Sequence, residues 1–598
     1  MTPPPTAVLE AITTGAFLLV LSIVVPLAGA LLAFAAGGRN LEKVALATLP
    51  IGLAIAVAIA FTMPSTGTPL VYLLGGWAPP LGVALRADGL SAVMLVIAAL
   101  VICAIGVFAH ADFHTPTGVA EARAPFSFWI LLLGIWGALN TVFVGGDLFT
   151  LYVALELLTF AAVPLVCLDG RAETLQAALR YLLFALLGSV LYLVGTALLY
   201  GAYGTLDIVL LSQRVHAESA TLVAASLMTV GLLAKTALFP LHLWLPPAHA
   251  GAPPAGSAVL SALVVKGSFF IVIRLWFDVM PAVPGFAATQ LLAGLGAAAI
   301  LFGSVVALRQ ERLKLLIAYS TLAQIGYLFL TFPLAFASGQ LHSGGALSGG
   351  MLQAMSHATA KAAMFMSAGL IYAALGHDRI AGLGGIGRVL PMSILAFVLG
   401  GVALIGVPPG GAYLAKELLL QAAGETEQWW WAIVIQAGGI FTSAYLVLVL
   451  AHVLAPVDKP VTLRAHMLRA NVPWYQEAPA LLLALCSLLL GLVHWDAYLL
   501  VPQGTRLSLS ILETLSSALW PILVGGVLAI LLGRWSDWPP RIPLRGLSEA
   551  IVGPIRCSAL SAGEALERAD SILRQWPAAG LFLLALVILL GAAMLLGR

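Results

Sequence analysis

Long apolar runs recur along the whole sequence, and they constrain the fold more than any other feature. Each run is about 20 residues long, which is enough to cross a hydrocarbon core of about 30 Å. Apolar residues occupy 61% of the 598 positions and charged residues only 9%, whereas a soluble chain carries about 25% charged residues. The sequence therefore predicts an all-α polytopic membrane protein.

Polar breaks between the apolar runs divide the chain into about 16 predicted transmembrane helices. Their predicted starts lie near residues 12, 41, 89, 125, 147, 174, 220, 253, 288, 313, 345, 391, 428, 476, 508 and 577. Between the second and third spans, the segment PLVYLLGGWAPPLGVALRAD is rich in Pro and Gly and mildly alternating, which indicates a short external hairpin. The N-terminal segment lacks the basic start of a signal peptide, so we expect it to be retained.

Basic residues are distributed unevenly between the two sides of this map. Of the 28 Lys and Arg residues, 18 fall in loops after odd-numbered spans, 4 in loops after even-numbered spans, five inside spans and the last at the C-terminus. Cytoplasmic loops carry the excess of Lys and Arg. We therefore expect both termini to lie on the outer side of a bacterial-type plasma membrane.

Four of the seven Lys residues lie inside predicted spans, at positions 235, 266, 361 and 416. An unpaired charge at mid-bilayer costs roughly 2.5 to 3.5 kcal/mol. A single buried Lys is as readily explained by a structural ion pair or by a side chain that reaches the interface. Four in separate spans, accompanied by acids and His, favour a proton pathway, because a buried Lys can lose its proton and Arg cannot.

Glu156 and Lys235 are predicted to pair. Glu156 lies in GDLFTLYVALELLTF, with Thr159 on the same helix face. Lys235 lies in GLLAKTALFPLHLWLP, where Pro240 interrupts the helix and frees the carbonyl of Thr236. Burial favours a neutral Lys and a nearby carboxylate favours a charged one, so separating the pair would release a proton.

A second helix break is predicted in ALIGVPPGGAYLAKELLL, where Pro408 and Pro409 precede Lys416. The two breaks lie five spans apart, and Lys and Pro occur in opposite order. An inverted repeat of five spans would leave this pattern. We therefore expect two inverted five-helix repeats, each with a broken helix.

Further ionisable residues lie between and beside these breaks. Lys266 lies in the eighth span, and His357 and Lys361 share a helix face in the eleventh. His titrates near neutrality and suits a relay. Weaker candidates for proton access or an accessory role, each with a structural alternative, are His242, His249, Asp147, Arg180 and Glu417.

No cofactor or metal site is predicted. The four Cys residues are far apart and form no CxxC pair. GLGGIGRV, residues 382–389, matches G-x-G-x-x-G literally, but it joins two spans without a preceding strand, so we interpret it as a loop. The sequence contains no P-loop or HExxH motif, and we expect no nucleic-acid partner.

Three segments together resemble a known family. KTALFPLHLWLPPAHAGAPPAGSAVLSALVVKG, ERLKLLIAYSTLAQIGYLFL and SHATAKAAMFMSAG are similar to the proton-translocating, antiporter-like subunits of respiratory complex I and its relatives. The resemblance covers roughly residues 80 to 455. The positions of Lys266 and Lys416 look most like the D subunit of Mrp-type Na⁺/H⁺ antiporters, with membrane subunits of energy-converting hydrogenases as close competitors.

The resemblance implies roles for the ionisable residues. Glu156 and Lys235 would form a modulating pair, and Lys266 would be the central relay. His357 would continue the path to Lys416, the exit-side protonation site. Lys361 also matches a recurrent family position. These roles imply proton transport without a cofactor, in a complex with other membrane subunits, with Na⁺ as an alternative coupled ion.

The expected organisation has five parts. Residues 1–124 hold three helices, 125–280 and 285–455 hold the two repeats, 456–533 hold helices 14 and 15, and 534–598 hold an amphipathic link and a terminal helix. The last part departs from the Mrp D subunit, which generally ends near fourteen helices. Its helix would reach about 40 Å, enough to clamp one neighbour.

Three assignments of function remain open from the sequence. The first is a component of an Mrp-type cation/proton antiporter. The second is a proton-pumping membrane component of a complex I-like oxidoreductase or an energy-converting hydrogenase. The third is a membrane partner of a carbon-uptake or formate-linked complex, or a scaffold that does not pump.

Overall fold

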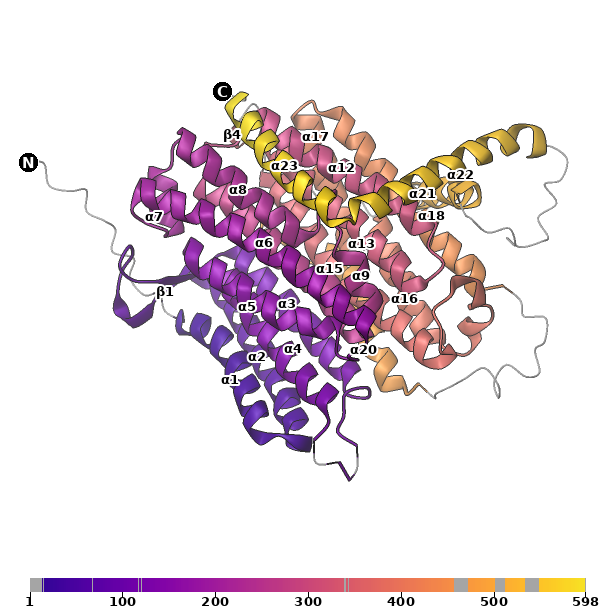
Figure 1. The fold of residues 1–598 in the computed structure, drawn as a ribbon, viewed down its shortest axis with the longest axis horizontal. Coiled ribbons are helices and arrows are strands. Elements are labelled where there is room, and N and C mark those ends of the chain that lie inside the picture. The colour runs from indigo at the N-terminus through magenta and orange to yellow at the C-terminus, as the bar shows by residue number, and fades with distance from the viewer. Residues whose placement is uncertain are drawn as a thin grey trace, which may run out of the picture.

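The computed structural model is a bundle of transmembrane helices with one helix lying across its outside (Figure 1). It describes residues 13, 15–66, 68–116, 118–119, 121–337, 340–341, 344–455, 472–500, 511–532 and 548–596. Fourteen helices in this part of the chain are long and apolar enough to span a membrane, and two shorter apolar segments, Pro391–Ile405 and Leu519–Ala529, accompany them. The prediction of an all-α polytopic membrane protein is confirmed.

The first part of the bundle begins with three helices and a hairpin. Its helices are α1 (Phe17–Ala36), α2 (Gly38–Thr66) and α3 (Gly89–Ala109). Strands β1 (Leu70–Leu73) and β2 (Ala84–Ala87) pair antiparallel, with Leu70 opposite Ala87. This pairing confirms the hairpin predicted between the second and third spans.

The first half of the central bundle contains six helices and one composite span. The helices are α4 (Arg123–Val144), α5 (Leu148–Val166), α6 (Ala172–Tyr203), α7 (Ile208–Arg214), α8 (Ser219–Thr236) and α9 (Leu245–Gly251). The composite span, 254–279, joins α10 (Pro254–Val259), a π-helical turn η2 (Leu260–Val264), α11 (Val265–Ile273) and a second π-helical turn η3 (Arg274–Val279).

The second half of the bundle contains α12 (Phe286–Leu308), α13 (Leu313–Phe329), α14 (Thr331–Ala335), α15 (Gly344–Leu375), α16 (Pro391–Ile405), α17 (Gly411–Glu425) and α18 (Trp429–Val453). A minimal hairpin of β3 (Phe336–Ala337) and β4 (Gln340–Leu341) lies between α14 and α15. Residues 382–389 form short turns between α15 and α16 rather than a nucleotide-binding loop after a strand.

Both predicted helix breaks are present. The chain leaves helical conformation between α8 and α9, around Pro240, and between α16 and α17, around Pro408 and Pro409. Before the first break, α8 packs closely on α6: a Cβ atom on Gly188 of α6 would lie 2.6 Å from the carbonyl oxygen of Gly231 in α8. Glycine at both positions lets the two backbones approach, as small residues do in membrane helices.

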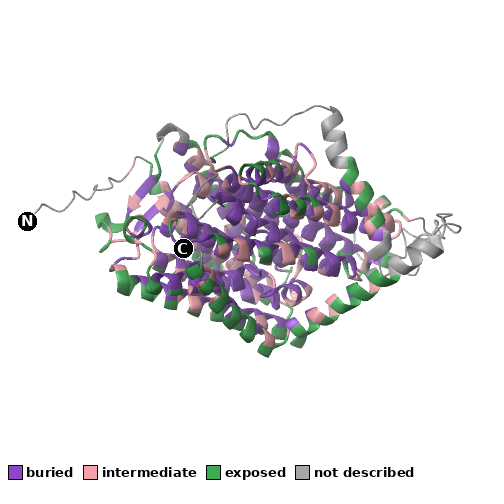
Figure 2. Cartoon of the chain, turned by 90° about the horizontal axis from the view of Figure 1, so that it is seen from above, coloured by how far each residue is buried: buried purple, intermediate pink, exposed green. Residues whose placement is uncertain are grey.

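Long α15 occupies the interior of the bundle. It packs against α3, α10, α13, α16, α17 and α20 (Trp474–Leu489), and nearly all of its side chains are buried. Buried residues fill the middle of the bundle, and exposed ones lie towards its outside (Figure 2). The ionisable residues on α15 are therefore enclosed by protein rather than by lipid.

The C-terminal part comprises α21 (Ile511–Leu532), α22 (Ser548–Leu573) and α23 (Trp576–Leu596). The predicted amphipathic helix is α22, which runs along the outside of the bundle and packs on α12 and α21 (Figure 1). The chain then turns into α23, which packs on α8 and α12. α22 therefore lies on helices of its own chain.

Candidate spans contain five basic residues that the sequence map assigned to loops: Arg39, Lys43, Arg123, Arg274 and Lys314. Arg274 begins the last turn of the 254–279 span and pairs with Asp88 at 2.6 Å. Lys314 is the second residue of α13 and is buried. Seven other loop residues used to predict the orientation, Lys459, Arg464, Arg469, Arg506, Arg534, Arg541 and Arg545, lie outside the described residues.

Candidate functional site

The predicted Glu156–Lys235 pair is formed. Nζ of Lys235 lies 3.5 Å from Oε1 of Glu156 and donates a shorter hydrogen bond, 2.8 Å, to Oγ1 of Thr159. The Lys235 side chain is 6% exposed and that of Glu156 15%. A third acceptor, the carbonyl oxygen of Leu155, lies 3.4 Å from Nζ. α5 thus presents three acceptors to the Lys at the end of α8.

The break after Lys235 is stabilised by hydrogen bonds to carbonyl groups that precede Thr236. α8 ends at Thr236, and Ala237 takes a left-handed conformation with φ of 59°. The indole of Trp244 donates to the carbonyl of Ala234 at 3.0 Å, and the Leu238 N–H donates to the carbonyl of Leu233. The carbonyls capped at the break therefore lie before Thr236, within the last turn of α8.

Hydroxyl groups connect this break to the next span. Oγ1 of Thr236 donates to Oγ of Ser268 in α11 at 3.0 Å. Two residues before Ser268, the fully buried Lys266 donates from Nζ to the carbonyl oxygen of Ser261 in the π-helical turn η2. π-helical turns are frequent at functional sites.

A second pair of hydroxyls lies between the π-helical turn η2 and α13. Ser261 Oγ and Thr321 Oγ1 lie 2.9 Å apart. The residue beside Thr321, Ser320, accepts a hydrogen bond from Nζ of the fully buried Lys361. The neighbouring residues Ser320 and Thr321 of α13 therefore contact Lys361 and the residue that accepts from Lys266, respectively.

His357 lies on α15, one turn before Lys361, and is fully buried. It lies near enough to Lys266 and Lys361 for their charges to interact with it. Neither ring nitrogen has a hydrogen-bond partner among the described residues. A buried polar nitrogen without a partner costs about 1 to 3 kcal/mol, so retaining one here favours a functional role.

Two glutamines and an aromatic ring continue the polar interior beyond Lys361. Nζ of Lys361 lies 5.9 Å from the ring centroid of Tyr445. Nε2 of Gln353 donates to Oε1 of Gln324 at 2.8 Å, and Nε2 of Gln324 donates to Oγ1 of Thr442 at 3.0 Å. Sequence patterning missed these groups because neutral amides and hydroxyls scarcely alter the hydropathy of a span.

Lys416 ends this row at the second helix break. Its Nζ donates to the carbonyl oxygen of Ile405, the last residue of α16, at 2.6 Å. It also lies 5.2 Å from the ring centroid of Tyr327, on the same helix as Gln324. The buried polar groups from Glu156 to Lys416, including Lys266, His357 and Lys361, are called the polar axis below.

His249 and Lys314 form a branch beside the polar axis. The buried His249 ring stacks on Phe365, with centroids 4.7 Å apart, and its charge would interact with those of Lys266, Lys314 and Lys361. Nζ of Lys314 donates to the carbonyl of Ala252 at 2.6 Å. Lys314 also lines a cavity of about 520 Å³ with Asp169, Arg171, Glu173 and Arg312, among other residues.

His242 has an unexpected partner. Its Nε2 lies 3.2 Å from Oδ1 of Asp570, on α22. Asp570 is buried and also accepts a hydrogen bond of 2.6 Å from Tyr319. Sequence analysis missed Asp570 because its charged neighbours in ALERADSILRQW are typical of a solvated surface.

Three weaker candidates are not brought to the polar axis. Asp147 caps the N-terminus of α5, accepting from the Phe149 and Thr150 N–H groups at 3.0 and 2.8 Å. Glu417 is exposed on α17, one residue after Lys416. Arg180 lines a different cavity, beside the start of α23.

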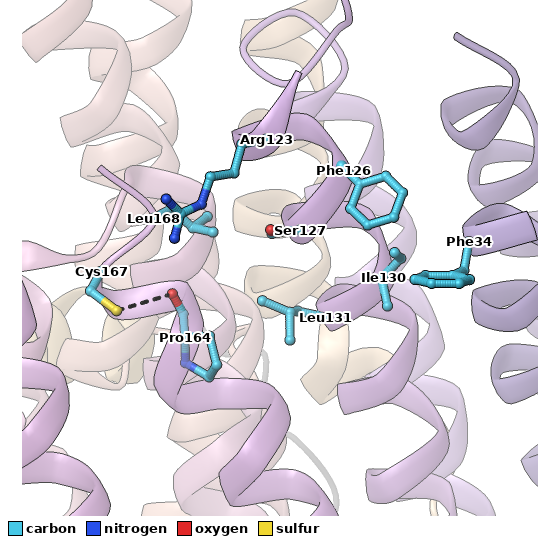
Figure 3. Close-up of a pocket in the computed structure, with 9 residues that line it drawn as sticks. All are labelled: Phe34, Arg123, Phe126, Ser127, Ile130, Leu131, Pro164, Cys167 and Leu168. Carbon is cyan, nitrogen blue, oxygen red and sulfur yellow. Dashed lines mark hydrogen bonds between the residues drawn. The ribbon is translucent and has the colours of Figure 1, made fainter. Parts of the chain in front are cut away.

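Another cavity, of about 330 Å³, lies between α1, α4 and the end of α5 (Figure 3). Phe34 and Phe126 pack together on one side of it, 5.5 Å between centroids, and Pro164 and Cys167 lie on the other. Its lining is mainly apolar and includes none of the polar-axis residues. We therefore do not assign it to the candidate site.

Comparison with known proteins identifies the family. The family model described as NADH:quinone oxidoreductase/Mrp antiporter, TM, matches residues 145–442, which contain Glu156, His357 and the four buried Lys residues of the polar axis. The N subunit of NADH-quinone oxidoreductase from Desulforudis audaxviator is 33% identical over 464 residues, covering 75% of this chain and 89% of that protein. This chain belongs to that family.

Other members of the NADH:quinone oxidoreductase/Mrp antiporter family are similar in sequence and structure. The D subunit of the Na⁺/H⁺ antiporter of Alkalihalophilus pseudofirmus is 28% identical, covering 71% of this chain and 84% of that protein. A chain of the Mrp complex from Dietzia sp. DQ12-45-1b superposes with a TM-score of 0.72 at 24% identity, covering 86% of this chain and all of that chain. The structural match shows a shared fold.

Proposed function

We propose that this chain translocates protons along the polar axis, as one membrane component of a hetero-oligomeric complex most like an Mrp-type cation/proton antiporter. The observation that carries the proposal is the row of four buried Lys residues linked by hydroxyl, amide and aromatic groups between two helix breaks. Groups spaced in this way can exchange protons through short reorientations or intervening water.

The Glu156–Lys235 pair is proposed to control when a proton enters the polar axis. When Glu156 lies close, its charge favours protonated Lys235; when the two separate, burial favours the neutral amine. Thr159 holds Nζ at 2.8 Å, closer than Glu156 does. A movement of α5 relative to α8 would therefore alter both contacts together and drive the proton towards Lys266.

Proton access is proposed at the cavity beside Lys314. Asp169 and Glu173 line this cavity and would attract protons from solution. His249, behind Lys314, would then pass them to Lys266, His357 or Lys361. On the predicted orientation this cavity faces the cytoplasm and both termini lie outside the plasma membrane.

The two halves of the bundle are proposed to be inverted five-helix repeats, residues 125–280 and 285–455. The broken helices α8–α9 and α16–α17 support this division, because each places a buried Lys beside its break. Lys235 would then serve uptake in the first half and Lys416 release in the second. Inverted repeats commonly place ion sites at such breaks.

A second candidate is a proton-pumping component of a complex I-like oxidoreductase. The 33% identity to an N subunit of NADH-quinone oxidoreductase favours it. So does the 32% identity to the M subunit of F420H2 dehydrogenase from Methanosarcina mazei, covering 60% of this chain and 71% of that protein. The two candidates share the polar axis and differ in whether ion exchange or electron transfer in neighbouring proteins drives it. Na⁺ dependence of transport separates them.

The test uses the complex purified with its native components and reconstituted in vesicles. Lys235→Ala and Glu156→Gln are expected to abolish coupled proton transport without changing the composition of the complex, while Lys43→Ala, at an exposed position on α2, leaves both unchanged. Proton flux is followed with a pH-sensitive dye inside the vesicles. Normal flux in either of the first two variants would overturn the proposal and leave a scaffold role.

A further inference from the structure

A basic cavity lies where α6 meets the corner between α22 and α23. Its volume is about 560 Å³, and its lining residues are Arg180, Ser571, Arg574, Gln575, Trp576 and Pro577. The cavity thus lies between α6, a transmembrane helix of the first half of the bundle, and the C-terminal extension formed by α22 and α23. None of the polar-axis residues lines it.

Positive charge in this cavity is only partly neutralised by protein. Arg180 makes no hydrogen bond or ion pair with any residue in the described part of the chain. Arg574 pairs with Asp570 at 2.8 Å, but its Nε has no partner among the described residues. The described residues that line the cavity include no acid. Two guanidinium groups beside a hydroxyl and an amide match the oxygen atoms of a phosphate.

The surroundings of the cavity fit a lipid rather than a soluble ligand. Trp576 and Pro577 begin α23, which is a candidate membrane span, and Trp is enriched at the membrane–water interface. On the same two helices, Leu179 and Leu183 of α6 and Leu581 of α23 are exposed. Both helices pack on α8, so apolar surface continues from the basic cavity along the bilayer-facing side.

We propose that this cavity binds the phosphate headgroup of an anionic phospholipid, whose acyl chains lie along the exposed leucines of α6 and α23. Basic pockets between membrane helices on the cytoplasmic side are known to take such headgroups. The bound lipid would join α22 to α6 through Arg574 and Arg180. This assignment is independent of proton transport and gives Arg180 a role outside the polar axis.

Native mass spectrometry of the purified full-length protein in its complex tests the assignment, with phosphatidylglycerol and phosphatidylcholine as probes. Retention of phosphatidylglycerol is expected to fall about fivefold for Arg180→Gln and about 25-fold when Arg574→Gln is added. Arg171→Gln is the matched control, because Arg171 is 74% exposed and lines a different cavity. Arg180→Gln alone leaves the Arg574–Asp570 pair intact, so its effect does not arise from loosening α22.

Three results would overturn the assignment. Equal retention of phosphatidylglycerol and phosphatidylcholine would show that binding does not require a net negative charge on the lipid. If Arg171→Gln lowered the retention of phosphatidylglycerol as much as Arg180→Gln does, binding would depend on the general positive charge of the surface rather than on this cavity. Displacement of the lipid by millimolar inorganic phosphate would identify a site for a soluble anion instead, because a headgroup held with its acyl chains does not exchange with free phosphate.

Discussion

The carboxylate of Asp570 lies 3.2 Å from Nε2 of His242, although 328 residues separate them in the chain. Asp570 also accepts a hydrogen bond from Tyr319 and pairs with Arg574. One turn earlier, Glu567 binds Arg309, the C-cap residue of α12, at 2.8 and 3.2 Å. These contacts attach the C-terminal extension to the helix break that follows Lys235.

Removing the Asp570 charge is expected to loosen α22. Asp570→Asn replaces a buried, charged acceptor by a neutral one, and hydrogen bonds to charged groups contribute about 1.5 to 3 kcal/mol each. We expect local unfolding of α22 to become easier by about 2 kcal/mol. Hydrogen exchange of α22 amides measures this directly.

Glu567→Gln is the matched control for that variant. The Glu567 side chain is 28% exposed and that of Asp570 only 3%, so solvent screening makes the Glu567 pair weaker. A loss of protection in Glu567→Gln as large as in Asp570→Asn would contradict the assignment of Asp570 as the principal attachment.

The attachment of α22 is expected to depend on pH in the acid range. Burial alone would raise the pKa of Asp570, but the hydrogen bond from His242, the charge of Arg574 and the hydrogen bond from Tyr319 lower it below 3.8. A folded pKa below the unfolded value gives stability that is complete above the unfolded pKa and is lost as pH falls through the folded pKa.

The difference in thermal unfolding midpoint between the wild type and Asp570→Asn should therefore be constant above about pH 5 and shrink below about pH 4. The neighbouring groups His242, Arg309, Glu567 and Arg574 are present in both proteins, so the subtraction removes the part of their pH dependence that does not involve Asp570. If the difference in unfolding midpoint grew as the pH was lowered, the pKa of Asp570 would be raised by folding rather than lowered, and the prediction would be wrong.

The sequence was most informative where charge and helix-breaking residues occurred together. Glu156 and Lys235 could be paired because few acids lie in apolar spans, and Pro240 and Pro409 interrupted two of those spans. The sequence pattern places Lys314 in a loop because it follows Arg312 closely. Its burial depends on a contact with Ala252, 62 residues away, which no local pattern contains.

The other features that the sequence did not predict involve neutral polar residues or contacts between residues far apart in the chain. Gln324 and Gln353 lie within long apolar runs, and nothing in their own segments shows that their side chains meet across α13 and α15. The pattern places Arg274 in a loop because charge usually marks the end of a span. Asp88 and Asp278 compensate its charge inside the helix end, at 2.6 and 2.7 Å.

Thr159 is expected to hold Lys235 for proton transfer. Thr159→Val removes the 2.8 Å hydrogen bond and leaves Nζ with Glu156 at 3.5 Å and the Leu155 carbonyl at 3.4 Å. Losing a hydrogen bond to a charged group, worth about 1.5 to 3 kcal/mol, should lower proton flux by about tenfold or more. Flux in reconstituted vesicles gives the measurement.

Thr141→Val controls for the loss of a membrane hydroxyl. Thr141 Oγ1 donates only within α4, to the carbonyl of Gly137 at 2.8 Å. We expect its flux to equal that of the wild type. A similar loss of flux in both variants would mean that packing, rather than the contact with Lys235, explains the effect of Thr159→Val.

The Gln324–Gln353 pair is expected to carry protons, through reorientation with water, between Lys361 and Lys416. Gln324→Leu removes both the acceptor for Gln353 and the donor to Thr442, so the second half of the polar axis loses its continuity. We expect proton flux to fall at least tenfold, which corresponds to an increase of about 1.4 kcal/mol in the barrier, while Lys235-dependent steps in the first half persist.

Gln290→Leu is the matched control. The Gln290 side chain donates a 2.6 Å hydrogen bond to Gln428, and neither residue belongs to the polar axis. Equal flux in Gln324→Leu and Gln290→Leu would show that protons reach Lys416 by another route.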